Sequence, residues 1–353
     1  MNGWKRFARE VTPYIPGEQP SGSDIVKLNT NENPWPPSPE VERILKTSPA
    51  EALRLYPDPS MSELVRAIAD AKGLKENQVY AGVGSDEILA MSFLAFFNGT
   101  VPVLFPDITY SFYDVWADLF RIPYRQIPVD ENFCIRTEDY ACENGGIVFA
   151  NPNAPTGVAL PLSDVRWILS QNPDVCVIVD EAYVDFGGRS AIELLDEFDN
   201  LLVVQTFSKS RSLPGLRIGY ACGSADMISC LSAVRNAINS YTLNRLSIEA
   251  GAAAVKDDAW YRQTCAAVVR TREWTKNELA RLGFSFPDSR TNFIFASHPD
   301  IAAGSLFEAL RSQGIYVRHF SGPRIDNYLR ITVGKPEEMA KLIRCLEKLV
   351  RKT

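Results

Sequence analysis

The sequence has few histidines and no cysteine motif. Only two histidines, His298 and His319, occur among its 353 residues, and the seven cysteines are scattered without a Cys-x-x-Cys spacing. A zinc site or a disulfide framework is therefore not expected, and a serine–histidine–aspartate triad has few candidates. We expect reduced, mostly buried thiols in a cytoplasmic protein that holds no metal.

Long apolar runs and an excess of basic charge are also absent. The longest apolar stretch, residues 88–97, is shorter than the roughly 18 residues that a membrane helix needs. Residues 1–10 lack the features of a secretory signal. The formal net charge is -6, whereas nucleic-acid and membrane surfaces favour a basic protein face. We therefore expect no nucleic-acid partner and no membrane partner, and we expect a small-molecule ligand.

The order of apolar segments predicts an α/β protein with two domains. From about residue 60 to 240, short β-branched apolar runs alternate with helical segments, which predicts a mainly parallel sheet covered by helices. After about residue 255, a long amphipathic helix and further strands and helices predict a compact α+β unit. We expect an N-terminal arm (1–40), a large domain (41–245) and a small C-terminal domain (246–353).

Polar side chains follow four of the predicted strands. They are Asp180 at the end of VCVIVD, Lys209 after LLVVQTFS, Asn151 and Asn153 after GIVFA, and Ser85 and Asp86 after VYAGVG. Ligands of parallel sheets bind beyond the carboxyl ends of the strands. The sequence therefore predicts that these side chains converge on one crevice.

The residue types at these strand ends suit one kind of cofactor. A lysine is usually a solvated surface residue, and an aspartate that ends a strand is often only a cap. An aldehyde cofactor bound as an imine, however, needs a lysine amine, a carboxylate that keeps a pyridine nitrogen protonated and a hydroxyl donor near its phenolic oxygen. Lys209, Asp180 and Tyr183 supply these three groups.

The segment GVGSDE and the surroundings of the lysine predict a phosphate cradle. The glycine turn leads into a helix whose first amides, at Ser85 and Asp86, face an anion. Thr206 and Ser208 add hydroxyls beside the lysine, and Arg217 follows it after eight residues and adds a charge-assisted pair. A single Gly-x-Gly is a weak signal, so the prediction depends on the combination.

Nine stretches resemble the pyridoxal-phosphate-dependent aminotransferases of fold type I, and most closely the histidinol-phosphate aminotransferase family of class II. They run from residue 27 to 334: KLNTNENPWPPSP, LRLYPDPS, GVGSDE, PDITYSFY, NPNAPTG, VDEAYVDF, TFSKSRSLPGLRIGY, TNFIFA and YLRITVG. The resemblance implies a large domain of three α/β/α layers. It also implies pyridoxal 5'-phosphate as cofactor, and a homodimer whose arm drapes over a partner and whose active sites are shared.

The resemblance assigns a cofactor role to several positions. Lys209 would form the internal aldimine and then carry a proton, Asp180 would pair with the pyridine nitrogen, and Tyr183 would donate to the phenolic oxygen. Tyr110 would stack on the cofactor ring. Tyr56 matches a tyrosine that reaches into the phosphate site of the neighbouring subunit.

Four further positions match residues near the substrate. Arg330 matches the arginine that clamps the α-carboxylate, a task for which a planar guanidinium is better suited than lysine. Arg318 matches a second arginine, and Tyr14 a tyrosine at the entrance; both favour a substrate with a distal phosphate ester. Asn33, in the NTNENP stretch, is also expected beside the substrate.

Two positions depart from the family pattern. Ala154 stands where the family commonly has an asparagine that contacts the phenolic oxygen of the cofactor. Either Asn153 reaches in from one residue earlier, or Tyr183 handles this oxygen alone. The segment HFSGPRIDN is one residue shorter than expected and adds Arg324, which leaves the distal end of the substrate pocket open.

The resemblance implies a ping-pong transamination in histidine biosynthesis. The amino group of L-glutamate would pass to imidazole-acetol phosphate and give L-histidinol phosphate. A threonine-phosphate decarboxylase and an aromatic amino acid aminotransferase are alternatives on the same scaffold. A non-catalytic binding protein is the alternative from another class, and it is disfavoured because such a protein would be expected to have lost Lys209 or Asp180.

Overall fold

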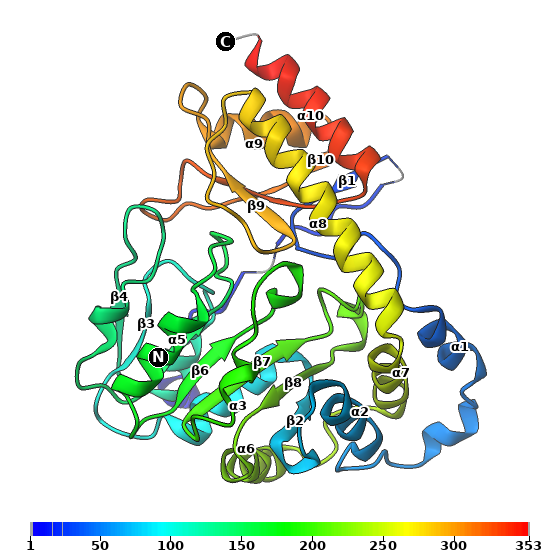
Figure 1. Ribbon diagram of the computed structural model, residues 1–353, viewed down its shortest axis with the longest axis vertical. Coiled ribbons are helices and arrows are strands. Elements are labelled where there is room, and N and C mark those ends of the chain that lie inside the picture. Colours follow the sequence, from blue (N-terminus) through cyan, green and yellow to red (C-terminus); the bar gives the residue numbers. More distant parts are fainter. Residues whose placement is uncertain (1–2, 16, 23, 352–353) are drawn as a thin grey trace.

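The computed structural model describes residues 3–15, 17–22 and 24–351. It contains one large sheet with helices on both faces and, beyond it, a smaller group of strands and helices (Figure 1). The long helix α8 (Asp258–Arg281) runs from the first part into the second. No helix within the described ranges is long and apolar enough to cross a membrane.

Seven strands form the large sheet. Their spatial order is β2 (Val79–Gly82), β8 (Gly219–Cys222), β7 (Leu201–Thr206), β6 (Val177–Asp180), β5 (Ile147–Ala150), β3 (Val103–Pro106) and β4 (Tyr124–Ile127). Only β8 runs antiparallel to its neighbours, β2 and β7. The other strand pairs are parallel, which confirms the predicted α/β class and its mainly parallel sheet.

Helices cover both faces of this sheet because successive strand residues point to opposite sides. On one face lie α1 (Pro39–Thr47), α2 (Ser62–Lys72), α5 (Leu162–Gln171) and α7 (Arg245–Lys256). On the other lie α3 (Gly84–Phe96), α4 (Tyr113–Phe120) and α6 (Ala225–Ile238). Along β5, Ile147 and Phe149 face the first set of helices and Val148 faces the second. The result is a three-layer α/β/α arrangement.

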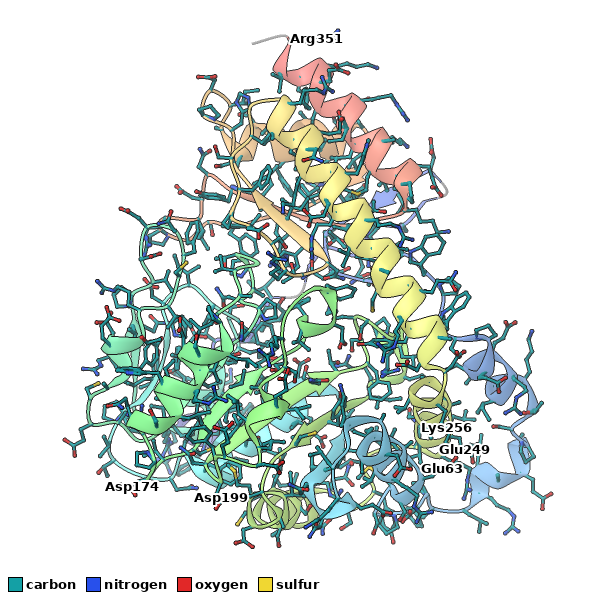
Figure 2. All side chains as sticks on the ribbon, in the orientation of Figure 1. Glu63, Asp174, Asp199, Glu249, Lys256 and Arg351 are labelled. Carbon is teal, nitrogen blue, oxygen red and sulfur yellow. The ribbon has the colours of Figure 1, made fainter. Side chains whose placement is uncertain are left out.

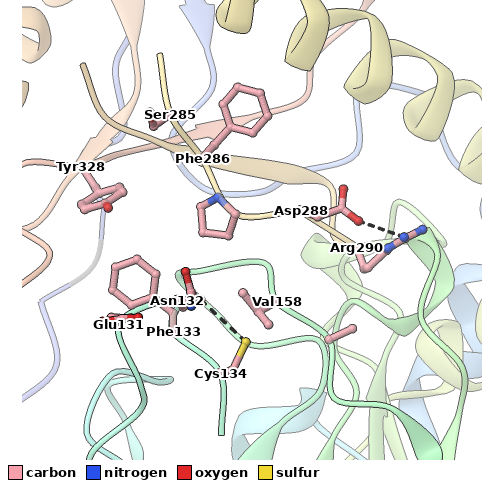
Figure 3. Close-up of a pocket in the computed structure, with 12 residues that line it drawn as sticks. Glu131, Asn132, Phe133, Cys134, Val158, Ser285, Phe286, Asp288, Arg290 and Tyr328 are labelled. Carbon is pink, nitrogen blue, oxygen red and sulfur yellow. Dashed lines mark hydrogen bonds and ion pairs between the residues drawn. The ribbon is translucent and has the colours of Figure 1, made fainter. Parts of the chain in front are cut away.

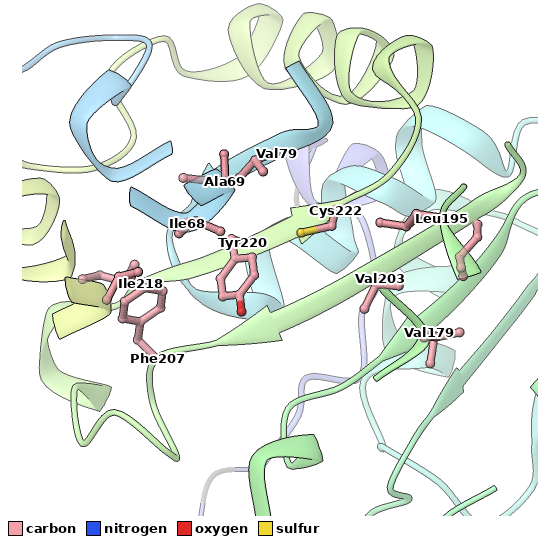
Figure 4. Close-up of a cluster of buried hydrophobic side chains, with 14 of the residues drawn as sticks. Ile68, Ala69, Val79, Val179, Leu195, Val203, Phe207, Ile218, Tyr220 and Cys222 are labelled. Atoms are coloured by element: carbon pink, nitrogen blue, oxygen red, sulfur yellow. The ribbon is translucent and has the colours of Figure 1, made fainter. Parts of the chain in front are cut away.

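The core of the first face shows why the strand sequences are almost wholly apolar. All residues of β2, β6, β7 and β8 are buried. Ile68 of α2 belongs to the same buried cluster as Val79, Val203 and Tyr220, which come from three neighbouring strands (Figure 4). Outside this core, Lys256 of α7 pairs with Glu63 of α2 (Figure 2).

The second part contains a three-stranded antiparallel sheet and a short parallel pair. The sheet is β11 (Arg318–His319), β12 (Leu329–Thr332) and β9 (Phe293–Ala296), and the pair is β1 (Val26–Lys27) with β10 (Ile315–Tyr316). They pack against α8, α9 (Ala303–Ser312) and α10 (Pro336–Val350). The α10 side chains Met339, Leu342, Ile343 and Leu346 are buried, as their spacing predicts.

Part of the segment predicted to be an arm belongs to the core of its own chain. Val26 and Leu28 are buried in the cluster formed by β9, β12 and α10, and β1 pairs with β10. α7 packs in the same core cluster as α1 and α2. The domain boundaries near residues 40 and 245 stay predictions.

The sheet brings the carboxyl ends of β2, β3, β5, β6 and β7 to one edge. Asp180 at the end of β6 lies beside Ala150 of β5 and Val204 of β7. Thr206, which ends β7, pairs with Gly219 at the start of β8. The loops after these strands therefore meet at one place, as predicted from the polar residues that follow them.

Candidate active site

One cavity of about 180 Å³ lies at this edge of the sheet. Its lining contains eleven of the residues predicted from sequence: Tyr14, Ser85, Asp86, Tyr110, Asp180, Tyr183, Thr206, Ser208, Lys209, Arg217 and Arg330. They come from the N-terminal segment, from the ends of four strands and from β12 of the second part. The fold thus assembles residues that are up to 316 positions apart, from Tyr14 to Arg330.

Lys209 is a part-buried amine without a carboxylate partner in the described residues. It follows β7, and its Nζ donates a hydrogen bond to the carbonyl of Thr30 at 3.2 Å. Burial, helped by the Arg330 cation, lowers the pKa of Lys209 from 10.5 to about 8, although the charges of Asp86 and Glu32 oppose this change. With this pKa roughly a tenth of the amine is neutral near pH 7, far more than for an exposed lysine, and the neutral form is the one that attacks a carbonyl.

Asp180 is a buried carboxyl, only 4% exposed, at the end of β6. The hydroxyl of Tyr113 donates to its Oδ2 at 3.0 Å, and the amide of Ala182 donates to its Oδ1 at 3.2 Å. Burial raises the pKa of Asp180 from 3.8 to about 7, although both hydrogen bonds oppose this change. A buried carboxyl of this kind favours a cationic partner, because the pair offsets the cost of desolvating the charge.

The residues predicted to hold a phosphate surround the N-terminus of α3. Ser85 and Asp86 occupy its first turn, whose amides have no partner within the helix. Arg217 donates from Nη2 to Asp86 Oδ2 at 3.3 Å and from Nη1 to Ser208 Oγ at 3.5 Å. The hydroxyls of Thr206 and Ser208 lie 3.1 Å apart.

Two glycines make room for this cradle. Gly84, which begins α3, has a φ of +78°, and a Cβ there would lie 2.8 Å from Arg217 Nη2. A Cβ on Gly219 would lie 2.5 Å from the backbone carbon of Gly84. A side chain at either position would fill the space beside the helix terminus. Because both residues are glycines, the first amides of the helix stay open to an anion.

Aromatic rings form one wall of the cavity. Tyr110 donates from its hydroxyl to Asp86 Oδ1 at 2.8 Å, and its ring packs edge-on against Tyr113 at a centroid distance of 5.8 Å. Tyr14 stacks on Phe112 at 4.3 Å. The hydroxyl of Tyr110 is therefore bonded and its ring is packed, while Tyr14, which also lines the cavity, stacks on the neighbouring Phe112.

Arg330 is a guanidinium without an ion pair among the described residues. It lies on β12 with its charge 5.4 Å from the ring centre of Phe293 and 5.6 Å from that of Phe320. Its Nη2 donates to the carbonyl of Asn29 at 3.2 Å, and its Nε is buried without a hydrogen-bond partner. Unpaired donors on a cation that lines a cavity are suited to an anionic ligand.

Residues 29–33 form a strap that contacts the cavity residues. Besides the bonds from Arg330 to Asn29 and from Lys209 to Thr30, Asn31 Nδ2 donates to the Tyr183 hydroxyl at 2.9 Å. Sequence reasoning missed Asn31 and also Tyr113. The polar run NTNEN and the second tyrosine of YSFY were the available signals.

Four residues with a predicted cofactor or substrate role do not line the cavity, and neither does Asn151, whose side chain bonds to the backbone of Leu160 at 2.9 and 3.0 Å. Asn33 lies next to it and donates to the carbonyls of Lys209 and Ser210 at 3.1 and 3.3 Å. Arg318 donates to the carbonyl of Ile15 at 3.5 Å and pairs across strands with Arg330. Tyr56 is 79% exposed and stacks on Tyr241. Their roles stay predictions.

Asn153, the fourth, turns its amide away from the cavity. It donates to the carbonyl of Ile108 at 2.9 Å and to Thr156 Oγ1 at 3.0 Å, and it accepts from Thr109 Oγ1 at 2.9 Å. Ala154 lines the cavity in its place. This geometry disfavours the first of the two alternatives left open by sequence, because the Asn153 amide holds the loop before Tyr110 instead.

Arg324, in the segment that is one residue shorter than expected, also directs its side chain away from the cavity. Arg324 Nη2 donates to the carbonyls of Val129 and Asp130 at 3.1 and 2.5 Å, and Nη1 lies 3.4 Å from Asp107 Oδ2. Its guanidinium thus joins this segment to the loop after β4. It is not among the residues of the cavity.

A larger, more open pocket of about 510 Å³ lies elsewhere (Figure 3). Phe133 and Val158 face Phe286 and Tyr328 across it. Its arginine, Arg290, is paired with Asp288 at 2.9 Å. The pocket contains no lysine and none of the predicted site residues, so the smaller cavity is the better candidate for chemistry.

Known proteins match nearly the whole chain. Residues 23–346 match the family model for class I and II aminotransferases. Histidinol-phosphate aminotransferase 1 of Pseudomonas aeruginosa is 52% identical over 343 residues, which cover 97% of this chain and 98% of that protein. The histidinol-phosphate aminotransferase of Acinetobacter baylyi is 50% identical over 350 residues and covers 98% and 97%. The crystal structure of histidinol-phosphate aminotransferase from Sinorhizobium meliloti in complex with pyridoxal-5'-phosphate has a TM-score of 0.84 at 23% identity; the match covers 93% of this chain and 91% of that chain and shows a shared fold.

Proposed function

The chain belongs to the class I and II aminotransferase family, and on that basis we propose that it is a pyridoxal-phosphate-dependent histidinol-phosphate:2-oxoglutarate aminotransferase of L-histidine biosynthesis. One observation carries the proposal. A part-buried lysine without an ion pair, a buried carboxyl and an unpaired guanidinium line one cavity of a chain that is about half identical, over its whole length, to histidinol-phosphate aminotransferases.

The cavity residues fit pyridoxal phosphate. The free amides of Ser85 and Asp86 and the guanidinium of Arg217, with the space left by the two glycines, suit the phosphate group. Asp180 suits the protonated ring nitrogen. A buried carboxylate pays a desolvation cost, and pairing with this cation offsets that cost. Tyr110 would lie against the ring. When bound, the cofactor joins an amino group through its aldehyde and withdraws electrons from the neighbouring carbon.

Lys209 would act as the proton carrier of the reaction. Its Nζ accepts the proton that leaves the α-carbon of the amino donor, which a neutral amine can do and an ammonium cannot. The lowering of its pKa to about 8 by burial and by Arg330 supplies the neutral form. Proton transfer by a positioned group typically contributes about 10²- to 10⁴-fold to the rate.

Arg330 would bind the α-carboxylate of L-glutamate; L-histidinol phosphate has no carboxylate and carries a phosphate ester instead. Its Nε is buried without a hydrogen-bond partner, and its Nη2 bonds to a backbone carbonyl, that of Asn29. A planar guanidinium can donate two parallel hydrogen bonds to a carboxylate and so fix the α-carbon in place. Tyr14, at the rim, and Arg318, on the neighbouring strand, would lie toward the distal phosphate ester of the substrate.

The enzyme would work as a homodimer with shared active sites. Leu53, Leu55 and Tyr56 are exposed apolar side chains of one short segment, and Tyr56 stacks on the exposed Tyr241. Apolar groups gathered on a surface favour burial by a partner. In the dimer, Tyr56 would reach the phosphate site of the partner. All seven cysteines are unpaired, which supports a reducing compartment such as the cytoplasm.

A half-reaction panel on the cofactor-loaded protein tests this function. Single-turnover rates would be measured with L-histidinol phosphate, phenylalanine, tyrosine and threonine phosphate under identical conditions. We expect the highest kcat/KM with L-histidinol phosphate and return of the loaded form by 2-oxoglutarate. Release of carbon dioxide from threonine phosphate, or faster reaction with the aromatic amino acids, would replace the proposed substrate with one of the two alternatives.

A further inference from the structure

Asn31 fixes the direction of the hydrogen bond at Tyr183. The side chains of Asn31 and Tyr183 are 1% and 9% exposed, and Asn31 Nδ2 lies 2.9 Å from the Tyr183 oxygen. An amide nitrogen only donates, so the tyrosine oxygen accepts this bond. The proton of the Tyr183 hydroxyl is therefore left for another acceptor.

The orientation of the Asn31 amide is set by its other contacts. Thr332 Oγ1 accepts from the backbone N–H of Asn31 and donates to Asn31 Oδ1, both at 3.0 Å. Asn292 Nδ2 donates to the carbonyl of Asn31 at 2.9 Å. Asn31 has a φ of +55°, which asparagine tolerates better than most residues. The oxygen of the amide is therefore tied to β12, and its nitrogen faces Tyr183.

Among the described residues, Asn31 is the one whose side-chain amide bonds to the Tyr183 hydroxyl. Ala154 lines the cavity and belongs to the same apolar cluster as Tyr183, so it offers a methyl group there. The amide of Asn153 is bonded to Ile108, Thr109 and Thr156. Hydrogen bonding from this wall of the cavity thus depends on the Tyr183 hydroxyl. Asn31 determines in which direction that hydroxyl donates its proton.

We propose that Asn31 is a positioning residue that keeps Tyr183 as a hydrogen-bond donor toward the phenolic oxygen of pyridoxal phosphate. The inference rests on the proposed function and adds a residue to its site. Donation to the phenolic oxygen stabilises the anionic form of the bound cofactor. The Asn31 bond also acts with Arg330 to lower the pKa of Tyr183 against the larger, opposing effect of burial.

The variant Asn31→Asp reverses this one bond with almost no change in shape. Its carboxylate still accepts from Thr332, but it accepts from Tyr183 as well and so takes the tyrosine proton away from the cofactor. We expect the dissociation constant for pyridoxal phosphate to rise about tenfold. We also expect the pH midpoint of the absorbance change of the bound cofactor to rise by about one pH unit.

A double-mutant cycle separates this effect from that of the added charge. In a Tyr183→Phe background there is no hydroxyl to redirect, so the loss of affinity caused by Asn31→Asp should be at least about fivefold smaller than in the wild-type background. The added negative charge alone would act equally in both backgrounds. Equal losses in the two backgrounds would overturn the proposal.

Asn172→Asp is a matched control for damage to the fold. Asn172 is also a buried asparagine, and it donates to the carbonyls of Tyr140 and Ile168, away from the cavity. This variant should lower the melting temperature and leave the cofactor affinity and the pH midpoint unchanged. A wild-type protein that binds no pyridoxal phosphate refutes the proposed function. A wild type that binds it, with an Asn31→Asp variant that behaves identically, refutes only the role of Asn31.

Discussion

Asp180→Asn should stabilise the cofactor-free protein while removing its activity. In the folded protein, burial raises the pKa of Asp180 from 3.8 to about 7, so the carboxyl holds its proton to a higher pH than it does in the unfolded chain. The folded state therefore binds more protons between about pH 4 and pH 7, and its free energy of unfolding falls as the pH rises through this window. At 1.36 kcal/mol per pKa unit, the cost of the ionised carboxyl above pH 7 is about 4 kcal/mol.

An asparagine at this position does not ionise, so it avoids this cost. The free energy of unfolding would be measured by urea denaturation of both cofactor-free proteins. It should be larger for the variant, and the difference between the two proteins should grow by roughly 3 kcal/mol between pH 5 and pH 8. Glu181, whose pKa burial also raises to about 7, is present in both proteins and cancels in the comparison. The same variant should lose at least about 100-fold in transamination rate, because an amide does not hold the ring nitrogen in its protonated form. A stability difference that is the same at pH 5 and pH 8 would refute the reasoning.

Two further substitutions test the anion-binding groups. Arg217→Ala removes the cation beside the first turn of α3, and the dissociation constant for pyridoxal phosphate, measured by fluorescence titration, should rise about 10- to 100-fold; an unchanged constant would show that Arg217 does not hold the phosphate. Arg330→Lys keeps the charge but loses the planar pair of donors, so KM for L-glutamate should rise at least about tenfold with a smaller change in kcat. A fall in kcat alone would argue against carboxylate binding by Arg330.

The sequence could predict that the site residues lie together, because the direction of the strands determines where the residues that follow them are placed. Lys209 and Asp180 each follow an apolar run that is buried on both faces, and such runs form the inner strands of a parallel sheet. The carboxyl ends of these strands share one edge of the sheet. The polar residues after them can therefore be predicted to lie together from the strand pattern alone. The glycine turn before Ser85 was a second local signal that the helix terminus would face a ligand.

The remaining contacts could not be predicted, because they depend on tertiary packing. Asn31 and Tyr183 are 152 positions apart, and the strands that bring them together, such as β1 with two residues, are too short to show a period. The direction of the Asn153 amide is decided by Thr156 of its own segment and by Ile108 and Thr109, which lie more than 40 positions away and are not revealed as partners by that segment. Tyr113 is fully buried at the start of α4, where its sequence looks like an ordinary apolar helix face.

The account depends above all on the amine of Lys209. The protein would be mixed with pyridoxal phosphate, reduced with borohydride and digested, and the modified peptide identified by mass spectrometry. The account predicts a single adduct on Lys209 and its loss in Lys209→Ala, together with the transamination activity. A reduced adduct on another lysine, or a Lys209→Ala variant that keeps its activity, would contradict it.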